Sequence, residues 1–259
     1  MEPLGPRAGR DPAGTFSGRP DEVARRLLGM LLVRSDGRIL RVVEVEAYGA
    51  GDDPASHAFG GRNPRNATMW GPSGLLYVHR SHGLHWCANV TCGSPGKPAA
   101  VLLRAGEPLA GLEAMRRDRW RQQRRRLDRD LARGPGRLGQ AMGIDASLDG
   151  ADLIAGDRGI ALRGTPGSFG DDLPGGPRIG ISRATELPWR FVVPGSPWLS
   201  APESPPSPPS PPLPPQRPGP TEGSAPTEGS ASVRAPGSHR EQRSRPVDPR
   251  AQVHPEPHP

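Results

Sequence analysis

Proline is concentrated at one end of this chain, and its position limits which residues can fold. Of the 35 prolines in the 259-residue sequence, 18 lie between positions 202 and 259, where the hexapeptide Pro-Thr-Glu-Gly-Ser-Ala also occurs twice in succession. Such a segment cannot bury enough apolar surface to offset the entropy lost on ordering. We therefore expect a disordered tail at 201–259, a disordered N-terminus at 1–14, and one compact domain at 15–200.

The expected domain carries all of the net positive charge. It contains 25 Arg and one lysine, Lys97, against 19 Asp and Glu, a surplus of +7, whereas the two flanking segments are neutral. A basic folded domain favours a polyanionic partner, although an ordinary basic surface would have the same composition. The arginine-rich stretch 116–133 is open to the same two interpretations: a solvated helix with internal ion pairs, or a surface that follows a DNA backbone.

Cysteine content and hydropathy exclude several classes of protein. Cys87 and Cys92 are too few for a disulfide framework and lack the paired spacing of a structural zinc site. The chain has no signal peptide and no long apolar run. We therefore expect a soluble intracellular protein without a membrane segment.

The order of apolar runs predicts an α+β fold, a single compact domain in which helices flank a curved, mainly antiparallel β-sheet. Pro20 begins the first expected helix, and Gly29 ends it. Further helices are expected at 111–133 and 137–142, with a tight turn at 134–136 between them. The expected strands are 30–34, 39–48, 75–79, 86–91, 99–104, 160–162, 179–181 and 191–193.

The chemistry of the chain is concentrated between Glu46 and Asn89. This stretch holds both tyrosines, two of the five tryptophans and four of the seven histidines, in a chain with only 4% aromatic residues. Such a concentration predicts a pocket for a flat substrate.

Within the strand 39–48, alternation places Glu44, Glu46 and Tyr48 on one face. This face could be merely solvated. However, carboxylates two positions apart on a strand lie about 7 Å from each other, a spacing that resembles inverting sugar hydrolases. One of the two could activate water against a glycosidic bond.

A metal site built from Glu46, Asp52, Asp53 and His57 is a further alternative. Nothing in the sequence fixes a ligand geometry for these four residues. We therefore expect neither a metal nor a cofactor.

An ordered run of motifs resembles the alkyladenine (3-methyladenine) DNA glycosylase family and covers about residues 20–200. The signature strand is Val43-Glu44-Val45-Glu46-Ala47-Tyr48, and Asp53-Pro54-Ala55-Ser56-His57 follows at the family's spacing. Shorter matches continue in order at 24–29, 64–66, 76–78, 83–89, 102–108, 134–138 and 195–198. Any one of these motifs alone is weak, but their ordered run is specific.

The resemblance implies a role for each matching position. Glu46 is expected to activate the attacking water, helped by Arg104 and by the backbone carbonyl of Ile179. Tyr48 and His57 are expected to line the base pocket, and Asn89 to exclude guanine. Arg65 and Arg137 are expected to contact the DNA backbone.

The chain departs from the family at two positions. His82 stands where the family has a wedge tyrosine, and His79 replaces another stacking tyrosine. An imidazole is smaller than a phenol and can become charged near neutral pH. We expect neutral rings at both positions, with excision of 7-methylguanine falling below about pH 6.5. Alternatively, both are surface residues that contact phosphate.

The resemblance implies a monofunctional enzyme of base excision repair. It would flip 3-methyladenine, 7-methylguanine or hypoxanthine out of double-stranded DNA and leave an abasic site. Lys97 lies away from the signature strand, so we expect no Schiff-base chemistry and no strand cleavage. We expect a monomer in the bacterial cytoplasm, associated with the nucleoid. The alternative is a weak or inactive module of the same fold that binds damaged DNA.

Overall fold

The computed structural model describes residues 14–94, 96–120 and 127–203. Of the segments expected to be disordered, 1–14 and 201–259, residues 1–13 and 204–259 lie outside this part of the chain, whereas residue 14 and residues 201–203 lie within it. The strands are β1 (Leu31–Arg34), β2 (Ile39–Tyr48), β3 (Leu75–Ser81), β4 (His85–Ser94), β5 (Lys97–Ala110), β6 (Ala151–Asp152), β7 (Ile160–Arg163) and β8 (Arg190–Val192).

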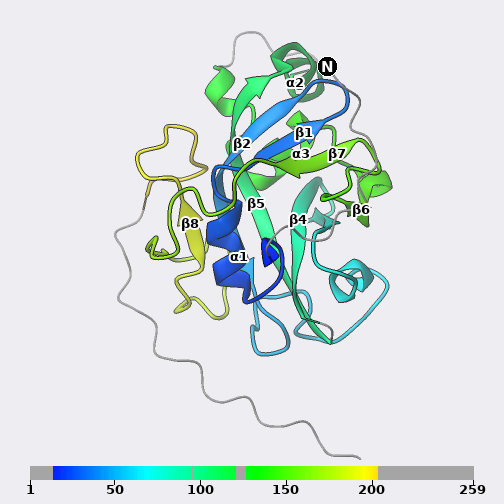
Figure 1. The fold of residues 1–259 in the computed structure, drawn as a ribbon, viewed down its shortest axis with the longest axis vertical. Helices are drawn as coiled ribbons and strands as arrows, with labels where there is room; N and C mark the ends of the chain where they lie inside the picture. The colour runs from blue at the N-terminus through cyan, green and yellow to red at the C-terminus, as the bar shows by residue number, and fades with distance from the viewer. Residues whose placement is uncertain (1–13, 95, 121–126, 204–259) are drawn as a thin grey trace, which may run out of the picture. The chain divides into compact units, whose positions relative to one another are not determined.

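These strands form one antiparallel, curved sheet (Figure 1). Their order is β6-β3-β4-β5-β2-β1-β7, and β8 pairs with β2. The Leu162 N–H donates to the Leu153 carbonyl at 2.9 Å, which joins the two ends of the sheet and nearly closes it. The predicted α+β class is confirmed.

The described residues form three α-helices: α1 (Pro20–Leu27), α2 (Leu112–Arg119) and α3 (Pro135–Ala141). Helices α1 and α3 pack on the sheet, and α2 packs against α3. Short 3-10 helices lie at η2 (Ala67–Trp70), η3 (Asp128–Asp130) and η4 (Ala146–Leu148). In α1 the fixed φ of Pro20 suits the first turn. Asp21 in that turn and Arg25 near the end complement the helix dipole. Val23 and Leu27 of α1 are fully buried in the main core.

Helix α3 lies very close to β4. A Cβ atom on Gly139 would stand 2.2 Å from the Trp86 carbonyl oxygen, and one on Gly136 would stand 2.7 Å from His85 Cβ. Only glycine permits this approach. The predicted tight turn at 134–136 is therefore wrong in part, because Pro135 and Gly136 already belong to the helix.

The predicted helix at 111–133 is also wrong at Trp120, just after α2 ends, and at 127–133, where the α-helix does not continue. Residues 121–126 lie outside the described part of the chain. Leu131 is fully buried in the core, and Arg133 forms an isolated β-bridge with Ala105. This tertiary packing overrides the helical propensity of the arginine-rich sequence.

The predicted strand at 179–181 is a loop. Pro177 has no N–H to donate to a ladder, and Gly180 adopts a positive φ of 77°. The N–H of Ile179 is used by a side chain instead, which brings this loop into the site described next.

Candidate active site

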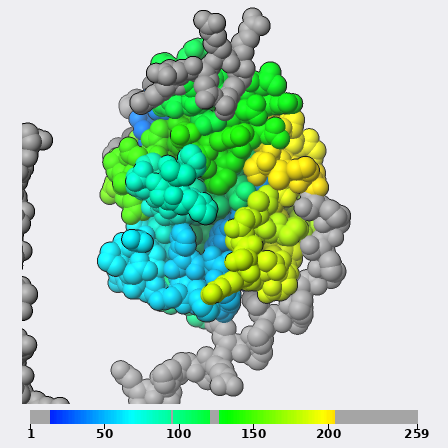
Figure 2. Space-filling view, turned by 180° about the vertical axis from the view of Figure 1, so that it is seen from behind, coloured from blue at the N-terminus to red at the C-terminus, as the bar shows by residue number. Residues whose placement is uncertain are grey.

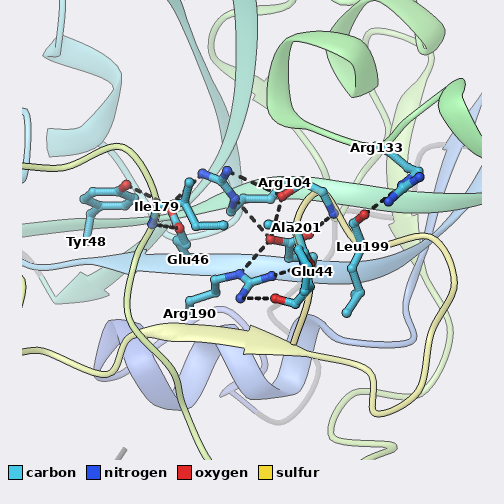
Figure 3. A network of polar contacts seen from close by, with 11 residues as sticks. Glu44, Glu46, Tyr48, Arg104, Arg133, Ile179, Arg190, Leu199 and Ala201 are labelled. Atoms are coloured by element: carbon cyan, nitrogen blue, oxygen red, sulfur yellow. Dashed lines mark hydrogen bonds and ion pairs between the residues drawn. The ribbon is translucent and has the colours of Figure 1, made fainter. Parts of the chain in front are cut away.

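Glu46 is fully buried near the end of β2, yet its carboxylate is surrounded by donors (Figure 3). Oε2 accepts hydrogen bonds from the Tyr48 hydroxyl at 2.9 Å and from Arg104 Nη1 at 3.0 Å. Oε1 accepts from the backbone N–H of Ile179 at 2.6 Å. The resemblance implied that the Ile179 carbonyl helps to activate the attacking water, which stays a prediction. The amide of the same residue contacts the carboxylate.

The surroundings of Glu46 suit a general base. A carboxylate has about four lone-pair directions, and three of them are used by these donors. One lone pair of Oε1 therefore has no partner among the described residues. Burial raises the pKa of Glu46 above its ordinary value, although Arg104 opposes this shift. A higher pKa makes the ionised carboxylate a stronger acceptor of a proton from water.

Glu44 is fully buried as well, so the solvated-face interpretation of the strand is wrong. Its oxygens accept hydrogen bonds from Arg104, Arg190 and Ser200. Neither carboxylate itself lines the cavity described next. The three donors of Glu46 all line it, whereas Arg104 is the one partner of Glu44 that does. A second catalytic carboxylate of the sugar-hydrolase type would need an oxygen free for the substrate. Both oxygens of Glu44 are held by Arg104, Arg190 and Ser200, so the arrangement does not support this alternative.

A cavity of about 400 Å³ lies beside the donors of Glu46. This volume is within the range of small-molecule sites. The predicted residues Tyr48, His57, His79, His82, Asn89, Arg104 and Ile179 all line it. Figure 2 shows the face on which the segment around residues 55–70, the β3–β4 hairpin and the loop at 170–182 meet around a hollow.

Cys87, whose role the sequence left open, also lines the cavity. Burial raises the pKa of its thiol to about 11. The group is therefore protonated at neutral pH and is a poor nucleophile.

Asn89 connects the polar groups on one wall of the cavity. Its Nδ2 group donates to the Tyr77 carbonyl at 3.0 Å and lies 3.1 Å from His79 Nδ1. Because Nδ2 can only donate, Nδ1 of His79 must be the unprotonated acceptor. The His57 ring packs edge-on against His79 at 4.4 Å between centroids, and His57 Nδ1 lies 2.9 Å from the Tyr77 hydroxyl.

The electrostatics of this wall agree with a neutral His79. Burial, with a smaller contribution from His57, lowers the pKa of His79 to about 4. The sequence suggested that this ring becomes protonated near pH 6.5. In the folded protein its protonation occurs at a much lower pH. A fall in 7-methylguanine excision that is caused by protonation of His79 should therefore occur near pH 4 rather than near pH 6.5.

This depressed pKa predicts a pH dependence of stability. Between pH 6.5 and about 4 the unfolded chain binds a proton at His79 that the folded chain does not bind. The contribution of the neutral His79 ring to the free energy of unfolding is thus fully present above pH 6.5 and is lost as the pH falls toward 4. We expect the free energy of unfolding, measured in urea from pH 7 to pH 4.5, to fall more steeply for the wild type than for His79→Tyr. Equal slopes would contradict a neutral, partly buried imidazole at His79 in the folded protein.

His82 lies at the tip of the β3–β4 hairpin, on a different part of the cavity rim. It has a φ of +50°, Gly83 follows at +68°, and the Leu84 N–H donates to the Ser81 carbonyl at 3.0 Å. Two positive φ values in succession are typical of a type I′ turn. Leu84 beside it is 72% exposed. The turn thus presents an imidazole and an apolar side chain outward.

Sequence reasoning missed Arg178, which supports Tyr48 from behind. Its side chain is fully buried and forms a two-fold ion pair with Asp53, at 2.7 and 2.9 Å. The guanidinium carbon lies 4.8 Å from the centre of the Tyr48 ring. Asp53 belongs to the signature run, so its carboxylate was visible in the sequence. Its partner lies 125 residues away in an unpatterned loop.

The predicted backbone-binding arginines are both exposed. Arg65 lines a second cavity of about 720 Å³ that shares His57, Tyr77 and His79 with the first. Arg137 lies 3.8 Å from Asp130. In the arginine-rich stretch, Arg116 pairs with Glu113 and Asp128, and Arg133 pairs with Asp130. The internal ion pairs expected of a solvated surface are therefore present there.

The described residues were expected to contain neither a metal site nor a membrane-spanning segment. In the described part of the chain, three or more His, Cys, Asp or Glu side chains nowhere gather as metal ligands would. Asp53, one of the four alternative ligands, pairs with Arg178 instead. Among the described residues, no helix has both the length and the apolar character needed to cross a bilayer.

Comparison with known proteins points to one family. The family model for methylpurine-DNA glycosylase (MPG) matches residues 14–197. Three bacterial relatives are each provisionally named a 3-methyladenine DNA glycosylase. The chain is 51% identical to that of Burkholderia lata over 191 residues, 74% of this chain and 91% of the relative. It is 45% identical to the relative from Frankia casuarinae over 215 residues, which cover 78% of this chain and 98% of the relative. It is 46% identical to the relative from Rhodococcus jostii over 187 residues, which cover 70% of this chain and 81% of the relative.

Proposed function

The chain belongs to the methylpurine-DNA glycosylase family and is thus a DNA glycosylase that hydrolyses N-glycosyl bonds, and from this premise we propose its substrates and mechanism. It extrudes alkylated or deaminated purines, among them 3-methyladenine, 7-methylguanine and hypoxanthine, from double-stranded DNA. It then cleaves the glycosidic bond with a water molecule and leaves an abasic site. The observation that carries the proposal is a buried carboxylate, Glu46, held by three donors beside a cavity that can take a flat base.

The proposed chemistry begins with water at the open lone pair of Glu46 Oε1. The carboxylate accepts a proton from this water as its oxygen attacks the sugar carbon, and the purine leaves with the bonding electrons. The negative charge of Glu46 also stabilises the positive charge that develops on the sugar. Arg104 and Ile179 hold the carboxylate in place, at 3.0 and 2.6 Å.

The cavity walls supply recognition of the base. Tyr48 presents its ring to one side of the cavity, and His57 and His79 line another. Electron-poor alkylated purines stack favourably on such rings. Asn89 is 4% exposed and is held by two hydrogen bonds, so it cannot easily swing away from an exocyclic amine. This rigidity supports its proposed role in rejecting guanine.

The hairpin tip supports the proposed extrusion step. A flipped nucleotide leaves a gap in the base stack, and filling the gap offsets part of the unstacking cost of a few kcal/mol. His82 is exposed at a turn next to the cavity, so its ring can enter that gap. We further propose that the enzyme acts as a monomer in the bacterial cytoplasm, close to the nucleoid, with Arg65 and Arg137 on the DNA backbone.

A lesion panel tests this proposal. Purified protein is incubated with duplexes that each carry one hypoxanthine, 7-methylguanine or 3-methyladenine, and with an undamaged duplex. We expect alkali-labile abasic sites in lesion-bearing DNA only, and no strand cleavage before the alkali step. Tight lesion binding without base release would favour a damage-binding module. Cleavage without alkali would contradict the monofunctional assignment.

A further inference from the structure

Arg104 reaches from β5 to a position between two buried carboxylates of β2 (Figure 3). Its Nε donates to Glu44 Oε1 at 3.2 Å, and its Nη1 donates to Glu46 Oε2 at 3.0 Å. Its Nη2 lies 3.5 Å from the Ser200 hydroxyl. Each nitrogen of the guanidinium thus has its own partner, and the partner on the Nε side is Glu44 rather than the proposed base.

Glu44 is itself held by the segment that follows β8. The backbone N–H of Ser200 donates to Oε2 at 2.5 Å, and the Ser200 hydroxyl donates to Oε1 at 2.8 Å. Arg190 Nε donates to Oε1 at 2.8 Å, and the Nη groups of Arg190 reach the carbonyls of Ala201 and Pro202. The carboxylate of Glu44 therefore has little freedom to turn.

Stability alone does not account for this arrangement. Burying an ion pair costs desolvation energy, and apolar residues of the same volume often stabilise a protein as well or better. The four groups do balance in charge, since Glu44 and Glu46 face Arg104 and Arg190. Charge balance, however, would also be met by two separate pairs, without sharing Arg104 between the carboxylates.

Sharing Arg104 limits what it can do to Glu46. A guanidinium that faces one carboxylate prefers two parallel hydrogen bonds. Such a pairing with Glu46 would use both carboxylate oxygens, including the remaining lone pair of Oε1. Because Glu44 holds Nε and Ser200 lies at Nη2, only Nη1 reaches Glu46.

We infer that Glu44, oriented by Ser200 and Arg190, is a positioning residue that restricts Arg104 to one hydrogen bond with Glu46 and so keeps an oxygen of the base open to water. This inference rests on the proposed function, which makes Glu46 the base. It extends the machinery of the reaction to Glu44 and to the segment around Ser200, which connect to the cavity through Arg104.

Three variants test the inference at graded severity. Glu44→Gln removes the charge at constant shape, and Glu44→Gln/Arg190→Gln keeps the buried charge balanced if the single variant does not fold. Ser200→Ala removes only the hydroxyl. The control is Arg41→Gln/Glu107→Gln, which removes a partly exposed ion pair between the same two strands, at 2.8 Å. Each protein is measured for single-turnover release of hypoxanthine with enzyme in excess, for affinity to the lesion duplex, and for thermal midpoint.

We expect both Glu44 variants to lose about 10–100-fold in the single-turnover rate, as misplacement of a catalytic group does. Ser200→Ala should lose less, and the control should lose nothing. Lesion affinity should stay within a few-fold of the wild type in all four proteins. A folded double variant with the wild-type rate would overturn the inference, and so would a rate loss that saturating enzyme fully restores. Failure of the proposed function would look different, because the wild type itself would then release no base.

Discussion

Replacement of Glu46 by glutamine should nearly abolish base release while the protein still binds lesion-bearing DNA. Gln has the shape of Glu, and its side-chain oxygen can still accept the 2.6 Å hydrogen bond from Ile179. It cannot take a proton from water, and a general base contributes about 10²–10⁴-fold to a rate. We expect a loss of this size in single-turnover release of hypoxanthine. Affinity for the same duplex, measured by fluorescence anisotropy, should change only a few-fold.

Glu107→Gln provides a matched control for this substitution. Glu107 lies on β5, pairs with Arg41 at 2.8 Å and does not line the cavity. It should excise hypoxanthine at the wild-type rate. Equal release by Glu46→Gln and the wild type would exclude Glu46 as the base. Loss of both release and binding would instead indicate that Glu46 serves the shape of the site.

Of the substitutions proposed for this protein, Asp53→Ala should cause the largest loss in the free energy of unfolding. The Asp53 carboxylate is 1% exposed, pairs with both Nη groups of Arg178, and accepts backbone hydrogen bonds from Gly49 at 2.9 Å and Ala55 at 3.1 Å. Asp53→Ala leaves a buried guanidinium without a counter-ion, which costs about 3–5 kcal/mol. Since domains are stable by only about 5–15 kcal/mol, urea unfolding should show a much lower midpoint.

Two further variants separate charge from packing at this position. Glu107→Ala breaks a partly exposed ion pair and should cost at most about 1 kcal/mol. Asp53→Leu/Arg178→Met removes both charges together and should recover part of the stability lost in Asp53→Ala. If Asp53→Ala were no worse than Glu107→Ala, the buried pair would not carry the energy assigned to it.

Local sequence patterns predicted those parts of the fold in which local and tertiary preferences agree. The strand at 39–48 has the expected bounds, because its β-branched residues and its long-range pairing favour the same conformation. The helix from Pro20 was also predicted, since its proline, first-turn acids and apolar face all point to one structure. The conformation of a segment can be predicted from its sequence when its local preferences agree with the tertiary contacts that it makes.

The errors lie where distant contacts decide the conformation. The loop around Ile179 has the apolar composition of a strand, but its amide is drawn to Glu46, 133 residues earlier. Arg178 and Ser200 carry no motif of their own, and each acquires its role from a carboxylate on or just after β2. Single-sequence patterns contain periodicity and turn chemistry. They contain no information about which arginine forms an ion pair with which acidic residue far away in the sequence.

Strand β2 carries Glu44, Glu46 and Tyr48 and pairs with β1, β5 and β8. Amide hydrogens in such a strand exchange with solvent only when the whole domain opens, whereas hairpin tips exchange through local fluctuations. We therefore expect the proposed base to lie on the part of the fold that opens last, and the proposed wedge to lie at a hairpin tip that opens earlier. On warming, DNA contacts at the tip should loosen first, and the hydrolytic centre should survive until the domain itself melts.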